Sequence, residues 1–93
     1  MILVREWFVA KPGHASKLAA LIKEAQSSAP FRFRVMTDFT GEFNRVVLET
    51  ELEDLAALDE RMKYYETNKE LRNAMKGYAD MYVSGGREIL RIL

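Results

Sequence analysis

The stretch FRFRVMTDF, residues 31–39, alternates apolar and polar side chains with the two-residue period of a half-buried β-strand. Residues 40–43, TGEF, contain a glycine that permits a tight turn, and the alternation resumes in NRVVLETEL, residues 44–52. We therefore predict a β-hairpin over residues 31–52.

The charges of this hairpin predict how its strands pair. With the turn placed at residues 40–43, Arg34 lies opposite Glu49 and Arg32 lies opposite Glu51. A register shifted by one residue would place a glutamate among apolar side chains. Both arginines are thus predicted to meet carboxylates on one face of the sheet.

Apolar periodicity on either side of the hairpin completes the order of elements. We expect a strand at residues 2–10, a helix from His14, a second helical region from Leu55 that restarts at a capping box of Thr67 and Glu70, and a last strand at residues 87–93. Gly85 and Gly86 predict a β-bulge before that strand. The order β-α-β-β-α-β predicts an α+β, ferredoxin-like fold: one four-stranded antiparallel sheet with both helices on one face.

Length and composition favour one small domain over residues 1–93. Lys and Arg together number 14, as do Asp and Glu, so we expect neither a nucleic-acid nor a membrane partner. No cysteine is present to supply a thiolate nucleophile or a sulfur ligand. Without a signal peptide or a long apolar segment, we expect a cytoplasmic protein. We expect no metal site and no cofactor.

The first strand predicts an assembly, because it is apolar on both sides while two helices can cover only one face of the sheet. Trp7, Met36 and Val47 share the face that the helices leave open, and Ile89 is a further candidate for it. A second subunit is the simplest cover for such side chains, so we predict a homodimer packed sheet to sheet.

The same open face carries the candidate binding residues. An aromatic ring, apolar side chains and guanidinium groups could together hold a small aromatic or carboxylated molecule. The residues of this predicted site are Trp7, Arg5, Arg34, Met36, Val47 and Glu49. Arg87 and Arg91 could join Arg5 and Arg34 on that face to bind a carboxylate. The alternative is that Trp7 is ordinary packing and that these arginines form ion pairs with Glu6, Glu49 and Glu51. His14, the only histidine, follows a Pro-Gly pair where an exposed polar residue is common, so a catalytic role is the less favoured interpretation.

Three segments carry a family resemblance: VAKPGHASKLAAL at residues 9–21, GEFNRVVLETELEDLAALDE at residues 41–60 and REILRIL at residues 87–93. With them the chain resembles the NIPSNAP-like group of the dimeric α+β-barrel superfamily. The resemblance implies a ferredoxin-like protomer whose sheet packs against its twin, with an interior cavity in each half.

The resemblance implies no single reaction, because relatives in that superfamily include cofactor-independent monooxygenases, haem-degrading enzymes and lactone isomerases. The chain also departs from the group's pattern at Leu48, Thr50 and Leu71, where histidine or tryptophan is common. We expect a homodimeric barrel that binds a small aromatic or carboxylated molecule, as a cofactor-independent monooxygenase or isomerase if it is an enzyme. The alternative is a non-catalytic interaction or scaffold module with a packed interior.

Overall fold

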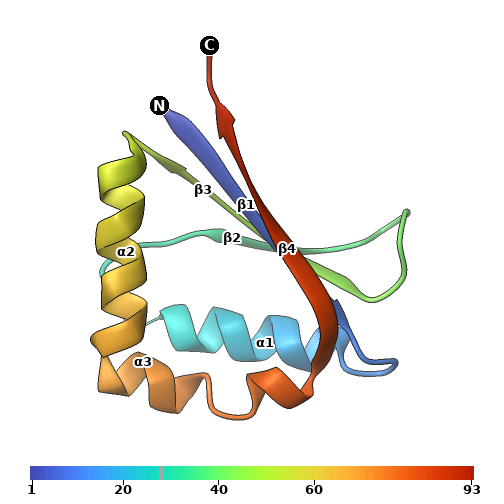
Figure 1. Ribbon diagram of the computed structural model, residues 1–93. Helices are drawn as coiled ribbons and strands as arrows, with labels where there is room; N and C mark the ends of the chain where they lie inside the picture. The colour runs from blue at the N-terminus through green and yellow to red at the C-terminus, as the bar shows by residue number, and fades with distance from the viewer. Residues whose placement is uncertain (28) are drawn as a thin grey trace.

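The computed structural model describes residues 1–27 and 29–93, and its elements follow the predicted order (Figure 1). The elements are β1 (Ile2–Ala10), α1 (Ala15–Gln26), β2 (Arg34–Thr37), β3 (Arg45–Leu52), α2 (Leu55–Thr67), α3 (Lys69–Ala74), the 3₁₀ turn η1 (Tyr78–Asp80) and β4 (Tyr82–Arg91).

The four strands form one antiparallel sheet in the order β2-β3-β1-β4. The helices pack against one face of the sheet, where Leu18 and Ile22 of α1 bury Val46 of β3. A second cluster places Leu58 of α2 against Val4 of β1. The α+β, ferredoxin-like architecture predicted from the sequence is therefore confirmed.

The hairpin register is as predicted where both strands are regular. Arg34 lies opposite Glu49, and Val35 lies opposite Leu48. The strand is shorter than the alternation suggested, however, because β2 covers only Arg34–Thr37.

The predicted pairing of Arg32 with Glu51 is wrong. Arg32 precedes β2, and its guanidinium donates hydrogen bonds to the carbonyl oxygens of Gln26 at 3.0 Å and Ala29 at 2.5 Å. The last carbonyls of a helix lack partners within the helix. A cation close in sequence to the end of α1 satisfies them more readily than it reaches an exposed glutamate across the sheet.

The predicted capping box is also wrong. Thr67 is still part of α2, and its hydroxyl donates to the carbonyl of Lys63 at 2.8 Å. Asn68 instead has an extended backbone between the two helices, and its side-chain oxygen accepts a hydrogen bond from the backbone N–H of Leu71 at 2.9 Å. Asn68 is therefore the N-cap of α3, one residue later than predicted.

The last strand begins earlier than predicted, at Tyr82, and includes both glycines. A Cβ atom on Gly86 would lie 2.5 Å from Cζ2 of Trp7, and one on Gly85 would lie 2.5 Å from the Trp7 carbonyl oxygen. These glycines therefore make room for Trp7. The break in register falls just before them, between the partners of Val9 and Ala10.

Within the described residues, no helix combines the length and the apolar character needed to span a membrane.

Candidate functional site

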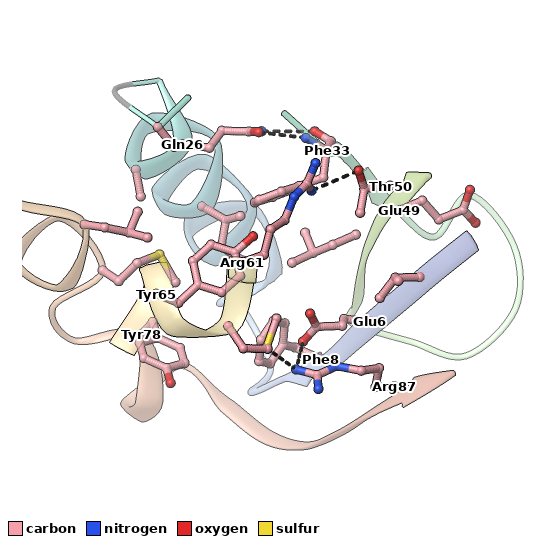
Figure 2. A pocket seen from close by; sticks show the side chains of 18 of the residues that line it. Glu6, Phe8, Gln26, Phe33, Glu49, Thr50, Arg61, Tyr65, Tyr78 and Arg87 are labelled. Atoms are coloured by element: carbon pink, nitrogen blue, oxygen red, sulfur yellow. Dashed lines mark hydrogen bonds and ion pairs between the residues drawn. The ribbon is translucent and has the colours of Figure 1, made fainter. Parts of the chain in front are cut away.

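A cavity of about 440 Å³ lies between the sheet and the helices (Figure 2). This volume is within the range of small-molecule sites. Its wall is mainly apolar, and the contributing residues include Val4, Phe8, Ile22, Ala25, Phe33, Leu48, Leu58, Met62, Leu71 and Met75. We call it the helix-side cavity.

Glu6 and Arg87 place an ion pair in this wall. They lie opposite each other on β1 and β4, and a guanidinium nitrogen of Arg87 is 3.2 Å from a carboxylate oxygen of Glu6. The same nitrogen is 3.5 Å from the sulfur of Met62 on α2 (Figure 2). The pair is thus held between the sheet and α2.

Arg61 enters the cavity from α2, where it follows Leu58 by three residues and so shares its sheet-facing side. Its guanidinium donates a hydrogen bond to the Thr50 hydroxyl at 3.0 Å (Figure 2). The guanidinium also lies 4.4 Å from the centre of the Phe31 ring. Among the described residues, no carboxylate lies within 4.0 Å of Arg61. Its charge is therefore balanced by no ion pair there.

Tyr65 lies one helical turn beyond Arg61 and also lines the cavity. Burial raises the pKa of its phenol, with Glu6 adding to the rise and Arg61 opposing it. The hydroxyl therefore stays protonated at neutral pH and can donate a hydrogen bond into the cavity.

Gln26 fixes one end of the cavity. Its side-chain nitrogen donates to the Phe33 carbonyl at 3.1 Å, and its side-chain oxygen accepts from the Phe33 N–H at 3.0 Å. The buried amide thus replaces a strand partner and holds the segment before β2 against α1.

The residues predicted as a site from the sequence lie on the opposite face of the sheet. Five of them line an open groove there, and Arg34 lies beside it through its ion pair with Glu49. The five are Arg5, Trp7, Met36, Val47 and Glu49. The structure therefore brings the predicted set together, but away from the helix-side cavity.

The charged predicted residues of the open face form ion pairs with one another or with Glu88. Glu49 accepts hydrogen bonds from Arg5 at 2.7 Å and from Arg34 at 2.8 Å, and Arg5 also pairs with Glu88 at 2.6 Å. The hydrogen bond from Arg5 is the main reason that the pKa of Glu49 is lowered. The same bond is the main reason that the pKa of Arg5 is raised.

Other candidate residues lie elsewhere. Arg87 and Arg91 are opposite Glu6 and Ile2, so they share the helix-covered face and do not join the arginines of the open face. Ile89, opposite Val4, lies on that covered face too. A ring nitrogen of His14 lies 3.2 Å from the Pro12 carbonyl, and His14 precedes α1 without lining the cavity.

Reasoning from the sequence missed the helix-side cavity and Arg61. The signals were present as single charges inside apolar patterns: Glu6 in the row of Val4 and Phe8, and Arg61 on the side of α2 that carries Leu58. A charge at such a position must find a partner or a polar space.

The protein resembles known proteins in structure but not detectably in sequence. No family model and no curated protein matches the sequence. An uncharacterised NIPSNAP domain protein from Burkholderia xenovorans is similar with a TM-score of 0.86 and 11% identity, covering 100% of this chain and 95% of that one. An uncharacterised NIPSNAP-like domain protein from the same organism has a TM-score of 0.84 and 18% identity, covering 99% and 84%.

A further similar structure is an antibiotic biosynthesis monooxygenase, with a TM-score of 0.72 and 16% identity, covering 100% of this chain and 99% of that one. Identities this low establish the fold alone. The chain therefore has the fold of the NIPSNAP domain proteins, as its sequence pattern indicated.

Proposed function

We propose that the protein binds a small aromatic or carboxylated organic molecule in the helix-side cavity. The observation that carries this proposal is an apolar cavity of about 440 Å³ that holds Arg61 without a carboxylate partner among the described residues. An apolar space with a few convergent polar groups is the usual character of a ligand site.

The open face then serves a different purpose, which is to pair two copies of the chain. Trp7, Met36 and Val47 are bulky side chains on the face that carries no helix. Their charged neighbours already neutralise one another within the protomer, so a second copy meets few unpaired charges. Two sheets packed in this way would form the dimeric barrel.

If the protein is an enzyme, proton transfer is the reaction that the helix-side cavity supports best. Glu6 can accept a proton from a bound ligand, while Arg87 holds its carboxylate in place. Tyr65 can donate a hydrogen bond to the ligand. Proton transfer of this kind suits an isomerase, or a monooxygenase that uses the electrons of its own substrate, in keeping with the monooxygenase among the similar structures.

Isothermal titration with a panel of aromatic acids, phenols and quinols tests the proposal. Ala25→Leu fills the cavity from α1, and Ala20→Leu on the exposed side of that helix is the matched control. We expect at least one compound to bind the wild type and the control but not Ala25→Leu. A packed scaffold module would bind none of the panel.

A further inference from the structure

The charges of the helix-side cavity do not balance, although those of the whole chain do. Arg61, Arg72 and Arg87 all line the cavity, while Glu6 is the one described carboxylate that faces it. Glu49 contributes to the wall, but its carboxylate is turned to the opposite face, as Figure 2 shows, where arginines hold it. The cavity therefore carries an excess of positive charge.

We propose that the ligand is an aromatic carboxylate and that its negative group pairs with Arg61. This inference rests on the proposed function and specifies its ligand. One terminal nitrogen of Arg61 donates to the Thr50 hydroxyl at 3.0 Å, and the Tyr65 hydroxyl also lies beside the guanidinium. The remaining N–H groups form a planar fork that matches the two oxygens of a carboxylate.

Arg61 is a better anchor than the other two arginines of the wall. Arg87 is already engaged by Glu6 and by the sulfur of Met62. Arg72 is exposed on α3 and reaches only the Glu66 carbonyl, at 3.5 Å. Arg61 alone combines a fixed position, between Thr50 and the Phe31 ring, with the absence of a described counterion.

The residues around Arg61 also suit the aromatic ring of a ligand whose carboxylate pairs with Arg61. Tyr65 stays neutral beside Arg61, so it can donate a second hydrogen bond to the same anion. Phe8, Phe33 and Leu48 provide apolar surface along the sheet. At the far side, Glu6 can accept a hydrogen bond from a hydroxyl substituent of the ligand.

A pair of probes that differ in charge tests this inference. Isothermal titration compares 2-naphthoate with the neutral 2-naphthalenemethanol, which has a similar shape. We expect naphthoate to bind the wild type at least about tenfold more tightly, because a paired charge adds a charge-assisted hydrogen bond. Its affinity should fall as NaCl is raised, whereas that of the alcohol should not.

Variants assign the effect to Arg61. Arg61→Gln should weaken naphthoate binding about tenfold or more and leave the alcohol within about twofold. Lys63→Gln, a matched control on the exposed side of α2 and outside the cavity wall, should change neither probe by more than about twofold. Arg61→Lys, which keeps the charge but loses the fork, should bind naphthoate with intermediate affinity.

The two proposals fail in different ways. Equal affinity of the wild type for both probes, with no dependence on salt, overturns the assignment of an anion while the proposed function stands. Absence of binding by either probe overturns the assignment of an aromatic carboxylate, and absence of binding across the whole panel overturns the proposed function as well. The comparison on the wild type needs no variant, so it holds even if Arg61→Gln fails to fold.

Discussion

At the scale of single residues, the single charges within apolar patterns carry most of the information about function. Glu6 interrupts the helix-facing row of β1, and Arg5 interrupts the row on the open face. Each has a partner on a neighbouring strand: Glu6 pairs with Arg87, and Arg5 pairs with Glu49. The alternation could be predicted from the sequence, but the presence of a cavity beside Glu6 could not.

The two glycines beside Trp7 give the first prediction. Gly85→Ala should lower the free energy of unfolding by about 1–3 kcal/mol, because its Cβ would meet the Trp7 carbonyl and one strand would have to move. Gly86→Ala meets only the indole ring, so it should cost less but alter tryptophan fluorescence. Urea unfolding and emission spectra measure the two effects. Equal stability of Gly85→Ala and wild type would contradict this account of the close approach between β4 and β1.

Glu49 gives the second prediction, which concerns pH. Its folded-state pKa lies below the ordinary value of 4.5, chiefly because Arg5 donates to the carboxylate. The resulting stability is fully present above pH 4.5 and is lost as the pH falls through the lowered pKa. Glu49→Gln should therefore lose less stability than the wild type between pH 6 and pH 3.

Urea unfolding at both pH values measures this difference. Glu51→Gln is the control, because Glu51 is a nearby exposed carboxylate and forms no ion pair within the described residues. Parallel losses in wild type and Glu49→Gln would contradict the account of Glu49.

At the scale of elements, the start of α3 gives the third prediction. Asn68→Ala removes the side-chain acceptor for the Leu71 N–H and should destabilise the protein by about 1 kcal/mol. Thr67→Ala should have a smaller effect, since its hydroxyl bonds only to the Lys63 carbonyl within α2. Thermal unfolding of both variants separates the two possible caps. A larger loss for Thr67→Ala would restore the capping box that the sequence suggested.

The existence and order of the elements could be predicted from the sequence, because apolar periodicity reports which side of each segment is covered. Their ends could not. Arg32 continues the alternation of the hairpin yet bonds to a carbonyl at the end of α1. Gly85 and Gly86 were predicted to form a bulge before the last strand but belong to β4. In both cases a contact distant in sequence or a helix end decided the outcome over the local pattern.

The candidate site was only partly predictable for the same reason. The open-face set is correctly grouped, because period-two alternation assigns residues to faces. The helix-side cavity depends on how α2 packs against β3 and how α3 packs against α1 and α2, and a linear pattern does not contain that arrangement (Figure 1). Tyr65 and Arg61 line the cavity together because they lie one helical turn apart on α2.

At the scale of the whole molecule, the sheet separates two surfaces with different proposed roles. The covered face encloses the helix-side cavity, and the open face carries Trp7, Met36 and Val47. If both proposals hold, a ligand and a second copy of the chain bind on opposite sides of one sheet.

The open face gives the fourth prediction. Sedimentation equilibrium should show a dimer at micromolar concentration, because bulky apolar side chains of that face become buried in the interface. Met36→Glu places a charge beside Val47 and in the same row as Trp7 on this face, so it should shift the equilibrium towards monomer. Arg72→Glu, on α3 away from the open face, is the control. A stable wild-type monomer at that concentration would contradict the sheet-to-sheet assembly.

The central claim is that the ligand binds on the helix-covered side of the sheet. The NMR signals of the methionine methyl groups can test it, because methionines lie on both sides. Met62 and Met75 line the helix-side cavity, whereas Met36 lies on the open face. In a methyl-labelled sample titrated with 2-naphthoate, the account predicts that the signals of Met62 and Met75 shift and that of Met36 does not. Shifts confined to Met36, together with a change at the Trp7 indole, would place the ligand on the open face and contradict the account.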